Sequence, residues 1–257
     1  MKTCAIIMFW DCEEILPYCV DNWLKCVDDV IIVWSLNSNF GKHRNNQQYL
    51  PNDPRVICLN WEPNQTKGAV INERAKRNHG LQYAKQHGYT HFVTSDADEF
   101  YIPELFKLEL EKFSDPNLSG LVCASQVYFK SPGLTIGLDV TLVPFIHKVT
   151  PTLYYEWNSD YPYAFVDRQI RIDPTRQFNI KHGIQWSDII MHHYSYVRRD
   201  FEVKIKNSTA YENLERSTIR EDLEKASPGY YCKFYQKQLI ECEDLFGIQL
   251  NNESGSI

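Results

Sequence analysis

The sequence contains few residues of the kinds that mark unusual proteins. It has only 11 glycines and 12 prolines in 257 residues, which excludes collagen-like and low-complexity chains. Its eight cysteines form no C-x-x-C pair and no dense cluster, so neither a zinc knuckle nor a disulfide framework is indicated. We therefore expect a globular protein of a reducing compartment, and a cytoplasmic location.

Long apolar runs and basic clusters are also missing. The best apolar runs, 5–10 and 30–34, are far shorter than the roughly 18 residues that a membrane span needs. The net charge is −6 and no Lys/Arg run occurs, which argues against nucleic acid and anionic membranes as partners. We expect no transmembrane segment and no nucleic-acid partner.

The first half of the chain alternates between strand and helix patterns. The strand patterns are short apolar runs, and the helix patterns carry apolar residues three and four apart. Strands are expected at 3–9, 29–34, 55–59 and 91–95, and helices at 13–27 and 67–87. This alternation predicts a mainly parallel sheet, in which ligands gather at the carboxyl ends of the strands.

The second half has a different pattern. Strand-like runs separated by Pro, Gly, Asn and Asp predict mixed or antiparallel strands, and two later stretches show a helical period. The expected strands are 119–129, 141–149, 152–157, 165–172 and 188–196, and the expected helices are 198–226 and 230–246. We expect one domain over residues 1–250, followed by a tail at 251–257.

Two carboxylates follow the fourth expected strand. In the run Asp96-Ala97-Asp98-Glu99-Phe100, residues i and i+2 of an extended backbone project to the same side. Crowded carboxylates repel each other unless they share a cation, and their hard oxygens suit Mg²⁺ or Mn²⁺ bound to a diphosphate. The alternative is a polar turn in which Asp98 caps a helix near Pro103.

The order of motifs resembles that of a known enzyme family. After the first strand comes the segment W-D-C-E-E-I-L (10–16), and a polar helix containing Arg74, Lys76, Arg77 and Asn78 precedes D-A-D-E-F (96–100). Together these are similar to glycosyltransferases of the GT-A fold, particularly family 2 and its D-x-D-E-F members. The resemblance covers roughly residues 3–102.

The resemblance implies a fold, and it implies a separate role for each of three segments of the chain. The fold is α/β, with a Rossmann-like, mainly parallel central sheet flanked by helices, additional mixed or antiparallel strands, and C-terminal helices. Residues 1–102 would bind the nucleotide sugar and the metal. Residues 103–197 would form the acceptor side, and 198–247 the C-terminal helices.

The resemblance also assigns roles to single residues. Asp98 corresponds to the aspartate that binds the divalent ion, and Asp96 to the one that reaches the ribose, or the ion through water. Asp11 and Glu13 would border the nucleotide pocket. Arg77 would approach the site from its helix, although a solvated helix face is an equal alternative for it.

The segment after the second strand departs from the family. Members commonly carry D-x-x-S-x-D there, whereas this chain has Trp34-Ser35-Leu36-Asn37-Ser38-Asn39 and lacks both acids. Asn37 still offers an amide donor and acceptor to a base. Trp10 or Trp34 could stack on that base or, alternatively, lie in the core.

A late histidine is a further candidate metal ligand. His192 and His193 end an expected strand, and the H-Y-S sequence resembles that of lipopolysaccharide-type family 2 members. Neighbouring residues of a strand face opposite ways, so only one of the two is a ligand. We favour His193, because it directly precedes the matching Tyr-Ser; one core and one surface histidine is the alternative.

Inverting transfer also needs a carboxylate that takes the proton of the acceptor hydroxyl. The candidate is Asp167, because family members carry a similar D-x-x-x-R segment near the acceptor side. Glu156 and Asp160 compete for the role. An ion pair of Asp167 with Arg168 or Arg171 is the structural alternative.

The implied activity is metal-dependent sugar transfer with inversion. A nucleotide-diphosphate sugar would be the donor, Mn²⁺ or Mg²⁺ the cofactor, and a glycan, a lipid-linked molecule or a protein the acceptor. A nucleotidyltransferase acting on a sugar phosphate is an alternative, disfavoured because no Gly-rich phosphate loop follows the first strand. The missing acids after the second strand suggest another alternative, a non-catalytic relative that binds nucleotide sugars.

Overall fold

The computed structural model describes residues 1–157, 171–208 and 216–250. Its first part contains β1 (Thr3–Phe9), α1 (Leu16–Cys26), β2 (Asp29–Trp34), β3 (Val56–Asn60), α2 (Ala69–Gln86), β4 (His91–Asp96), β5 (Glu99–Phe100) and α3 (Pro103–Glu111). Its second part contains β6 (Gly120–Phe129), β7 (Ser131–Lys148), β8 (Arg171–Ile172), β9 (Ile184–Tyr196), α4 (Phe201–Asn207), α6 (Ile219–Lys225), β10 (Tyr231–Cys232), β11 (Lys237–Gln238) and β12 (Ile240–Glu241). Short 3-10 turns lie at Gln47–Tyr49 and Lys112–Ser114.

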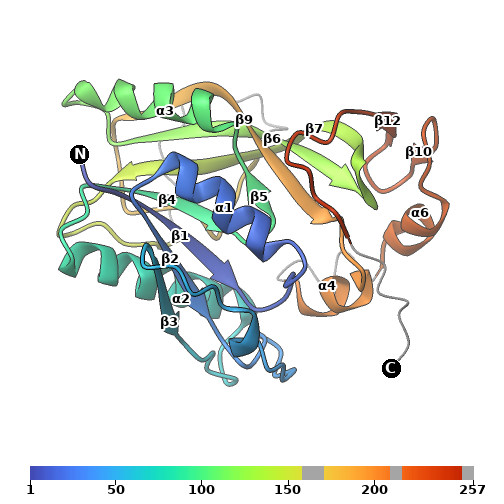
Figure 1. The fold of residues 1–257 in the computed structure, drawn as a ribbon, viewed down its shortest axis with the longest axis horizontal. Coiled ribbons are helices and arrows are strands. Elements are labelled where there is room, and N and C mark those ends of the chain that lie inside the picture. Colours follow the sequence, from blue (N-terminus) through green and yellow to red (C-terminus); the bar gives the residue numbers. More distant parts are fainter. Residues whose placement is uncertain (158–170, 209–215, 251–257) are drawn as a thin grey trace.

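One mixed sheet forms the centre of the molecule, in the order β3-β2-β1-β4-β7-β6-β9-β5 (Figure 1). Within that order, β3, β2, β1 and β4 run parallel to one another. These strands are apolar almost throughout, as strands covered on both faces must be. The predicted α/β architecture, with a parallel first half, is confirmed.

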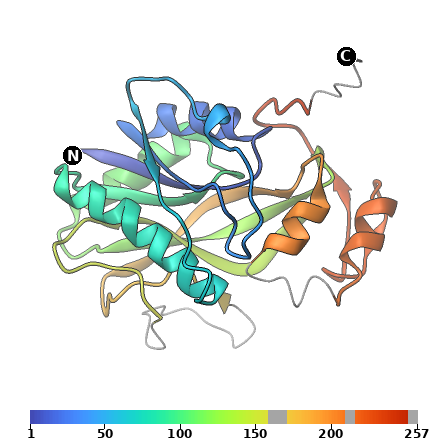
Figure 2. The same cartoon turned by 90° about the horizontal axis from the view of Figure 1, so that it is seen from below.

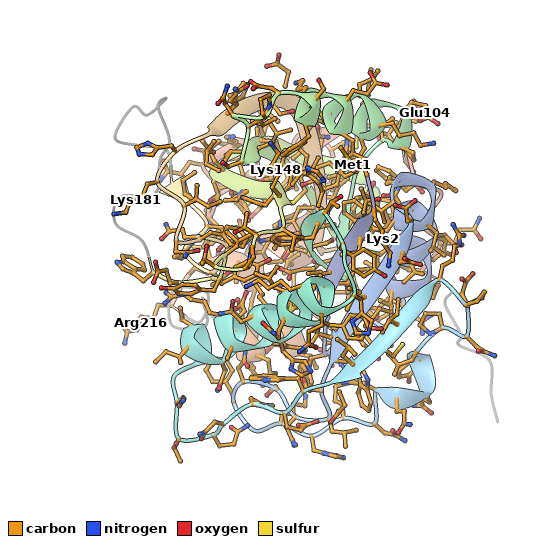
Figure 3. The ribbon with its side chains drawn as sticks, turned by 90° about the vertical axis from the view of Figure 1, so that its left-hand side faces the viewer. Met1, Lys2, Glu104, Lys148, Lys181 and Arg216 are labelled. Atoms are coloured by element: carbon orange, nitrogen blue, oxygen red, sulfur yellow. The ribbon has the colours of Figure 1, made fainter. Side chains whose placement is uncertain are left out.

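Helices cover both faces of the sheet. One apolar core joins β1 and β2 to α1 and α3, and a second joins the other face of those strands to α2. Figure 2 shows α2 on the side of the sheet opposite α1. Figure 3 views the molecule from the end at which β1 begins, near Lys2. In this view α3, which carries Glu104, and α2 lie on opposite sides of the strands. Among the described residues, no helix combines the length and apolarity needed to cross a bilayer.

The packing of α2 depends on one glycine. A Cβ atom at Gly80 would lie 2.4 Å from Cγ2 of Ile6 and 2.8 Å from Cγ2 of Val33, so no larger residue fits without movement. The helix therefore lies very close to β1 and β2. This close approach carries Lys76 and Arg77, one turn earlier, to the carboxyl ends of the parallel strands.

The second half of the sheet is mixed, as the sequence predicts. Strand β7 runs antiparallel to β4 and β6, whereas β9 runs parallel to β6. The short strand β5 pairs antiparallel with β9 and places Glu99 opposite His193. The expected strand at 152–157 is wrong, because only an isolated bridge between Tyr155 and Phe178 forms there. Most of the expected strand 165–172 lies outside the described residues.

The C-terminal region differs from the prediction. Within 198–226, α4 and α6 are helical where the chain is described, but 230–246 contains the short strands β10, β11 and β12 instead of a helix. Gln236 has a φ of 54°, a left-handed conformation that a regular helix excludes. Three aromatic residues with a helix-like spacing, Tyr230, Phe234 and Tyr235, instead pack against a core that includes residues of β6 and β7.

Candidate active site

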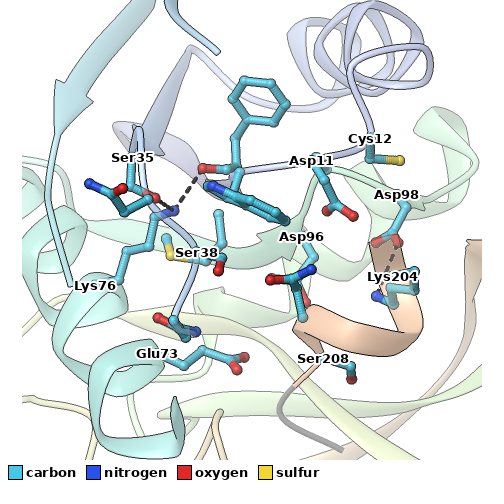
Figure 4. Close-up of a pocket in the computed structure, with 17 residues that line it drawn as sticks. Asp11, Cys12, Ser35, Ser38, Glu73, Lys76, Asp96, Asp98, Lys204 and Ser208 are labelled. Atoms are coloured by element: carbon cyan, nitrogen blue, oxygen red, sulfur yellow. Dashed lines mark hydrogen bonds and ion pairs between the residues drawn. The ribbon is translucent and has the colours of Figure 1, made fainter. Parts of the chain in front are cut away.

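A cavity of about 170 Å³ opens at the carboxyl ends of β1, β2 and β4. Its walls come from the loops after these strands, from α2 and from α4. Four predicted site residues line it together: Asp11, Asn37, Asp96 and Asp98. Figure 4 shows Asp98 facing Lys204 at one end of the cavity, and Lys76 close to Ser35 at the other.

Asp98 is surrounded by cationic side chains. Its Oδ2 accepts a hydrogen bond from Nη2 of Arg198 at 2.5 Å and lies 3.7 Å from Nζ of Lys204. The other amino group of Arg198 donates to Asp11 at 2.7 Å, so Arg198 bridges the two acids. Burial alone would raise the pKa of Asp98, but Lys204, His193 and Arg198 together hold that pKa well below its usual value.

The second predicted metal ligand lies next to Asp98. Nε2 of His193 is 3.6 Å from Oδ1 of Asp98, and Glu99 belongs to the same cluster, whose ligand atoms lie within 4.8 Å of one another. The peptide nitrogen of Tyr194 donates to the carbonyl of Asp98 at 2.8 Å and fixes the loop against β9. One carboxylate oxygen and one imidazole nitrogen at this spacing fit a divalent transition ion such as Mn²⁺.

His192 has a different environment, as alternation along the strand requires. Its side chain is buried, and its Nδ1 lies 2.8 Å from the hydroxyl of Tyr128. Burial lowers its pKa to about 4, so it is neutral at pH 7. Of the two neighbouring histidines, only His193 faces Asp98.

Asp96 is bound by two buried arginines. Arg77 from α2 donates to its Oδ1 at 2.9 Å, and Arg176 donates to its Oδ2 at 2.8 Å. Arg176 also binds Glu99 through both amino groups, one of them at 2.9 Å from Oε2. Burial opposes ionisation of Asp96, but the charges of Arg77 and Arg176 lower its pKa. The solvated-face alternative for Arg77 is wrong, because its side chain is fully buried.

Lys76 is buried at the opposite end of the cavity. Its Nζ donates to the carbonyl of Phe9 at 2.7 Å and to Oγ of Ser35 at 3.1 Å. Burial lowers its pKa to about 7, although the nearby charges of Asp96 and Glu73 oppose that shift. Lys76 is therefore a polar donor whose charge changes near neutral pH, in a wall where the sequence indicates only a solvated helix face.

Glu62, just after β3, holds the loop that follows β2. Its carboxylate accepts from the peptide nitrogens of Leu36 at 2.6 Å and Asn37 at 3.1 Å, and from Nδ2 of Asn37 at 2.9 Å. Partial burial favours the protonated form, but these donors outweigh it and lower the pKa of Glu62. An acid is thus present beside Asn37, although it comes from the neighbouring strand end.

Some predicted residues lie apart from this cavity. Glu13 pairs with Arg44 and lines a neighbouring cavity of about 320 Å³. Trp10 lines the main cavity, whereas Trp34 is buried in the core. Asp167, together with its competitor Asp160, lies outside the described residues.

Sequence reasoning missed five residues that shape the site: Lys76, Glu62, Arg176, Arg198 and Lys204. Glu62 and Arg198 each follow the carboxyl end of a strand, a position that favours ligand-binding residues. That positional signal was available for both. Arg176 and Lys204 have no such signal, because their partners are fixed only by the tertiary fold.

Comparisons with known proteins give distant structural likenesses. No family model and no curated protein matches the chain. TarS of S. aureus has a TM-score of 0.44 at 14% identity over 91% of this chain and 46% of its own. A shorter TarS structure, residues 1–349, gives 0.43 at 14% identity over 88% of this chain and 76% of its own. Mannose-1-phosphate geranyltransferase of Thermus thermophilus gives 0.33 at 15% identity over 52% and 45%. This chain spans about half of the full TarS chain, and likenesses at this level assign no activity.

Proposed function

We propose that this protein is a metal-dependent glycosyltransferase that moves a sugar from a nucleotide-diphosphate sugar to an acceptor hydroxyl, with inversion. The observation that carries the proposal is the pairing of Asp98 with His193, 3.6 Å apart, where Asp98 lines a cavity at the carboxyl ends of parallel strands. This is where open α/β sheets bind nucleotides. The motif resemblance over residues 3–102 supports the same activity.

The two ends of the cavity suit the two ends of a nucleotide diphosphate. Lys76 offers a hydrogen-bond donor at one end, where a base would lie, and Asp11 and Asp96 lie between the ends. Asn37, which also lines the cavity, would present its amide to that base. At the other end Asp98 and His193 would hold Mn²⁺ or Mg²⁺. When bound, that ion neutralises the charge that develops on the departing diphosphate.

The chain's own residues orient and charge this site. Arg198 is 3% exposed and holds the carboxylates of Asp11 and Asp98 in fixed directions. In the transfer, the acceptor oxygen bonds to the anomeric carbon as the bond from that carbon to the diphosphate breaks. A carboxylate accepts the hydroxyl proton; we propose Asp167, with Glu156 and Asp160 as competitors, and the nucleoside diphosphate leaves.

The test compares wild type with Asp98→Asn on a panel of UDP-, GDP-, dTDP- and CMP-sugars, with and without Mn²⁺. We expect turnover in wild type that chelation removes, and a loss of at least about a hundredfold in Asp98→Asn. Wild-type turnover by the variant would contradict the metal assignment. Glu243→Gln, the same change from acid to amide at a residue that does not line the cavity, is the control.

The products separate the competing functions. Transfer from a nucleotide-diphosphate sugar releases nucleoside diphosphate, whereas a nucleotidyltransferase acting on a sugar phosphate releases pyrophosphate. Thermal-shift measurements on the same panel report binding independently of turnover, because a ligand of the native state raises the melting temperature. Binding without transfer or hydrolysis would identify a non-catalytic nucleotide-sugar-binding protein.

A further inference from the structure

The carboxylate of Asp98 is already paired with cationic side chains, and these compete with a metal ion for its oxygens. Arg198 and Lys204 both approach its Oδ2, and His193 lies at its other oxygen. Asp11 contributes one further negative charge through Arg198. Arg198 and Lys204 therefore balance Asp98 and Asp11, and the neighbouring Asp96 and Glu99 are paired with Arg77 and Arg176. A divalent ion beside Asp98 adds two charges that these pairs do not compensate. Binding of that ion requires one cation to leave, or an anion to arrive.

Arg198 and Lys204 differ in their freedom to move. Arg198 is 3% exposed and bridges Asp11 and Asp98 through separate amino groups. Lys204 is 24% exposed, projects from the short helix α4 and contacts Asp98 at the longer distance of 3.7 Å. Its four-carbon stem turns freely compared with a planar, bidentate guanidinium. Lys204 is thus the cation able to leave Asp98.

The small volume of the cavity also indicates that Lys204 is the side chain that moves. At about 170 Å³ it is smaller than the roughly 300 Å³ at which ligand pockets begin. Lys204 and Asn207, one turn later in α4, both belong to the cavity wall, and Lys204 lies at the Asp98 end. Figure 4 shows the Lys204 side chain reaching across this end to Asp98. Withdrawal of Lys204 from Asp98 would enlarge the cavity at the end where a diphosphate would lie.

We propose that Lys204 exchanges partners on substrate binding: it neutralises Asp98 in the ligand-free protein, and binds the diphosphate oxygens of the donor once a metal ion lies between Asp98 and His193. This inference rests on the proposed function. It makes Lys204 an opponent of metal binding alone and a contributor to the combined binding of metal and nucleotide. Metal and nucleotide therefore bind with positive coupling, and Lys204 supplies part of that coupling.

The experiment compares wild type, Lys204→Met and Lys206→Met. Lys206 lies on the same helix, is 61% exposed and pairs only with Glu202 among the described residues, so it is the matched control. Mn²⁺ binding without nucleotide is measured from the electron paramagnetic resonance signal of the free ion. Binding of UDP, GDP, dTDP and CDP is then measured by calorimetry at saturating Mn²⁺.

Lys204→Met is expected to bind Mn²⁺ alone at least about threefold more tightly, because Asp98 loses a competing cation. The same variant should bind the preferred nucleoside diphosphate roughly tenfold more weakly, because a charge-assisted contact is lost. Lys204→Arg, which keeps the charge, should restore most of the nucleotide affinity. Lys206→Met should match wild type in both measurements.

The outcomes separate this inference from the proposed function. If wild type binds Mn²⁺ and a nucleoside diphosphate but Lys204→Met alters neither affinity, the exchange of partners is wrong and the proposed function stands. Tighter Mn²⁺ binding with unchanged nucleotide affinity overturns the contact with the diphosphate. If wild type binds no nucleoside diphosphate with Mn²⁺, the proposed function itself fails.

Discussion

Nη2 of Arg176 lies 2.8 Å from Oδ2 of Asp96, although eighty positions separate the two residues. The same guanidinium binds Glu99, and both Arg176 and Glu99 are nearly inaccessible to solvent. Arg176, which follows β8, therefore joins its own segment to Asp96 at the start of the D-A-D-E-F motif (96–100). Its charge is what allows two acids to lie so close together at this strand end.

Arg176→Met should destabilise the protein strongly. The substitution leaves Glu99 buried without its cation, and removal of one partner from a buried ion pair costs about 3–5 kcal/mol. Urea unfolding at pH 7 measures the loss. Lys225→Met removes a pair with Glu221 whose side chains are 57% and 40% exposed, and should cost far less. Equal losses in the two variants would contradict the role given to Arg176.

Glu62→Ala should weaken nucleotide binding clearly, while the free energy of unfolding should change little. The carboxylate fixes the loop around Leu36 and Asn37 from outside the cavity, so its loss frees that loop while the core stays intact. We expect about a three- to tenfold higher dissociation constant and a loss of about 1 kcal/mol or less in the free energy of unfolding. Calorimetry and urea unfolding measure the two quantities.

Glu62→Gln provides the control for that experiment. Its amide oxygen still accepts a hydrogen bond from one peptide nitrogen, so an intermediate dissociation constant is expected. If Glu62→Ala binds the preferred nucleoside diphosphate as wild type does, the loop does not belong to the binding site.

The buried His147 should make the fold sensitive to acid. Burial lowers its pKa to about 3, whereas in the unfolded chain a histidine has a pKa of about 6.5. Between these values only the unfolded chain takes up the proton, so the free energy of unfolding falls as the pH falls. The expected contribution is about 1.4 kcal/mol per pH unit from pH 6.5 downward.

His147→Leu tests this linkage by urea unfolding at several pH values between 8 and 4.5. The variant should show a shallower decline than wild type over the acid range. At pH 8 the histidine is neutral in both states, so any difference there reports packing against Phe92 and Phe178. Parallel curves for the two proteins would show that His147 does not carry the acid sensitivity.

The parts of the fold that sequence predicts are those with local signals. The strands β1 to β4 are short apolar runs, and the carboxylates of Asp96 and Asp98, two residues apart, mark the end of β4. The prediction fails at 230–246, where the spacing of Tyr230, Phe234 and Tyr235 suits a helix, but these residues lie before β10 and in the turn between β10 and β11. Their packing against β6 and β7, which local spacing does not reveal, accompanies this turn through Gln236.

In the candidate site, too, the residues with a local sequence signal were predicted and those without one were missed. Asp11, Asn37, Asp96 and Asp98 were placed from their positions after strands, and all four line the cavity. Their cationic partners were missed because a contact between Asp98 and Arg198 spans 100 positions and leaves no periodic trace in the sequence. Burial of Lys76 likewise depends on how closely α2 approaches β1, which the spacing of its residues does not reveal.

The long separation between the acids and their cations also affects the order in which the protein forms during synthesis. At about 5–20 residues per second, Arg198 is made about 5–20 s after Asp98, a delay set by the 100 positions between them. Throughout that interval Asp98 lacks Arg198, and for the first 77 of those positions Glu99 lacks Arg176, the side chain that binds it in the finished protein. The nascent first half therefore has parallel strands ready to pair, but two acids that resist burial. Closure of the sheet around β5 must wait until β9 and the residues after it have left the ribosome.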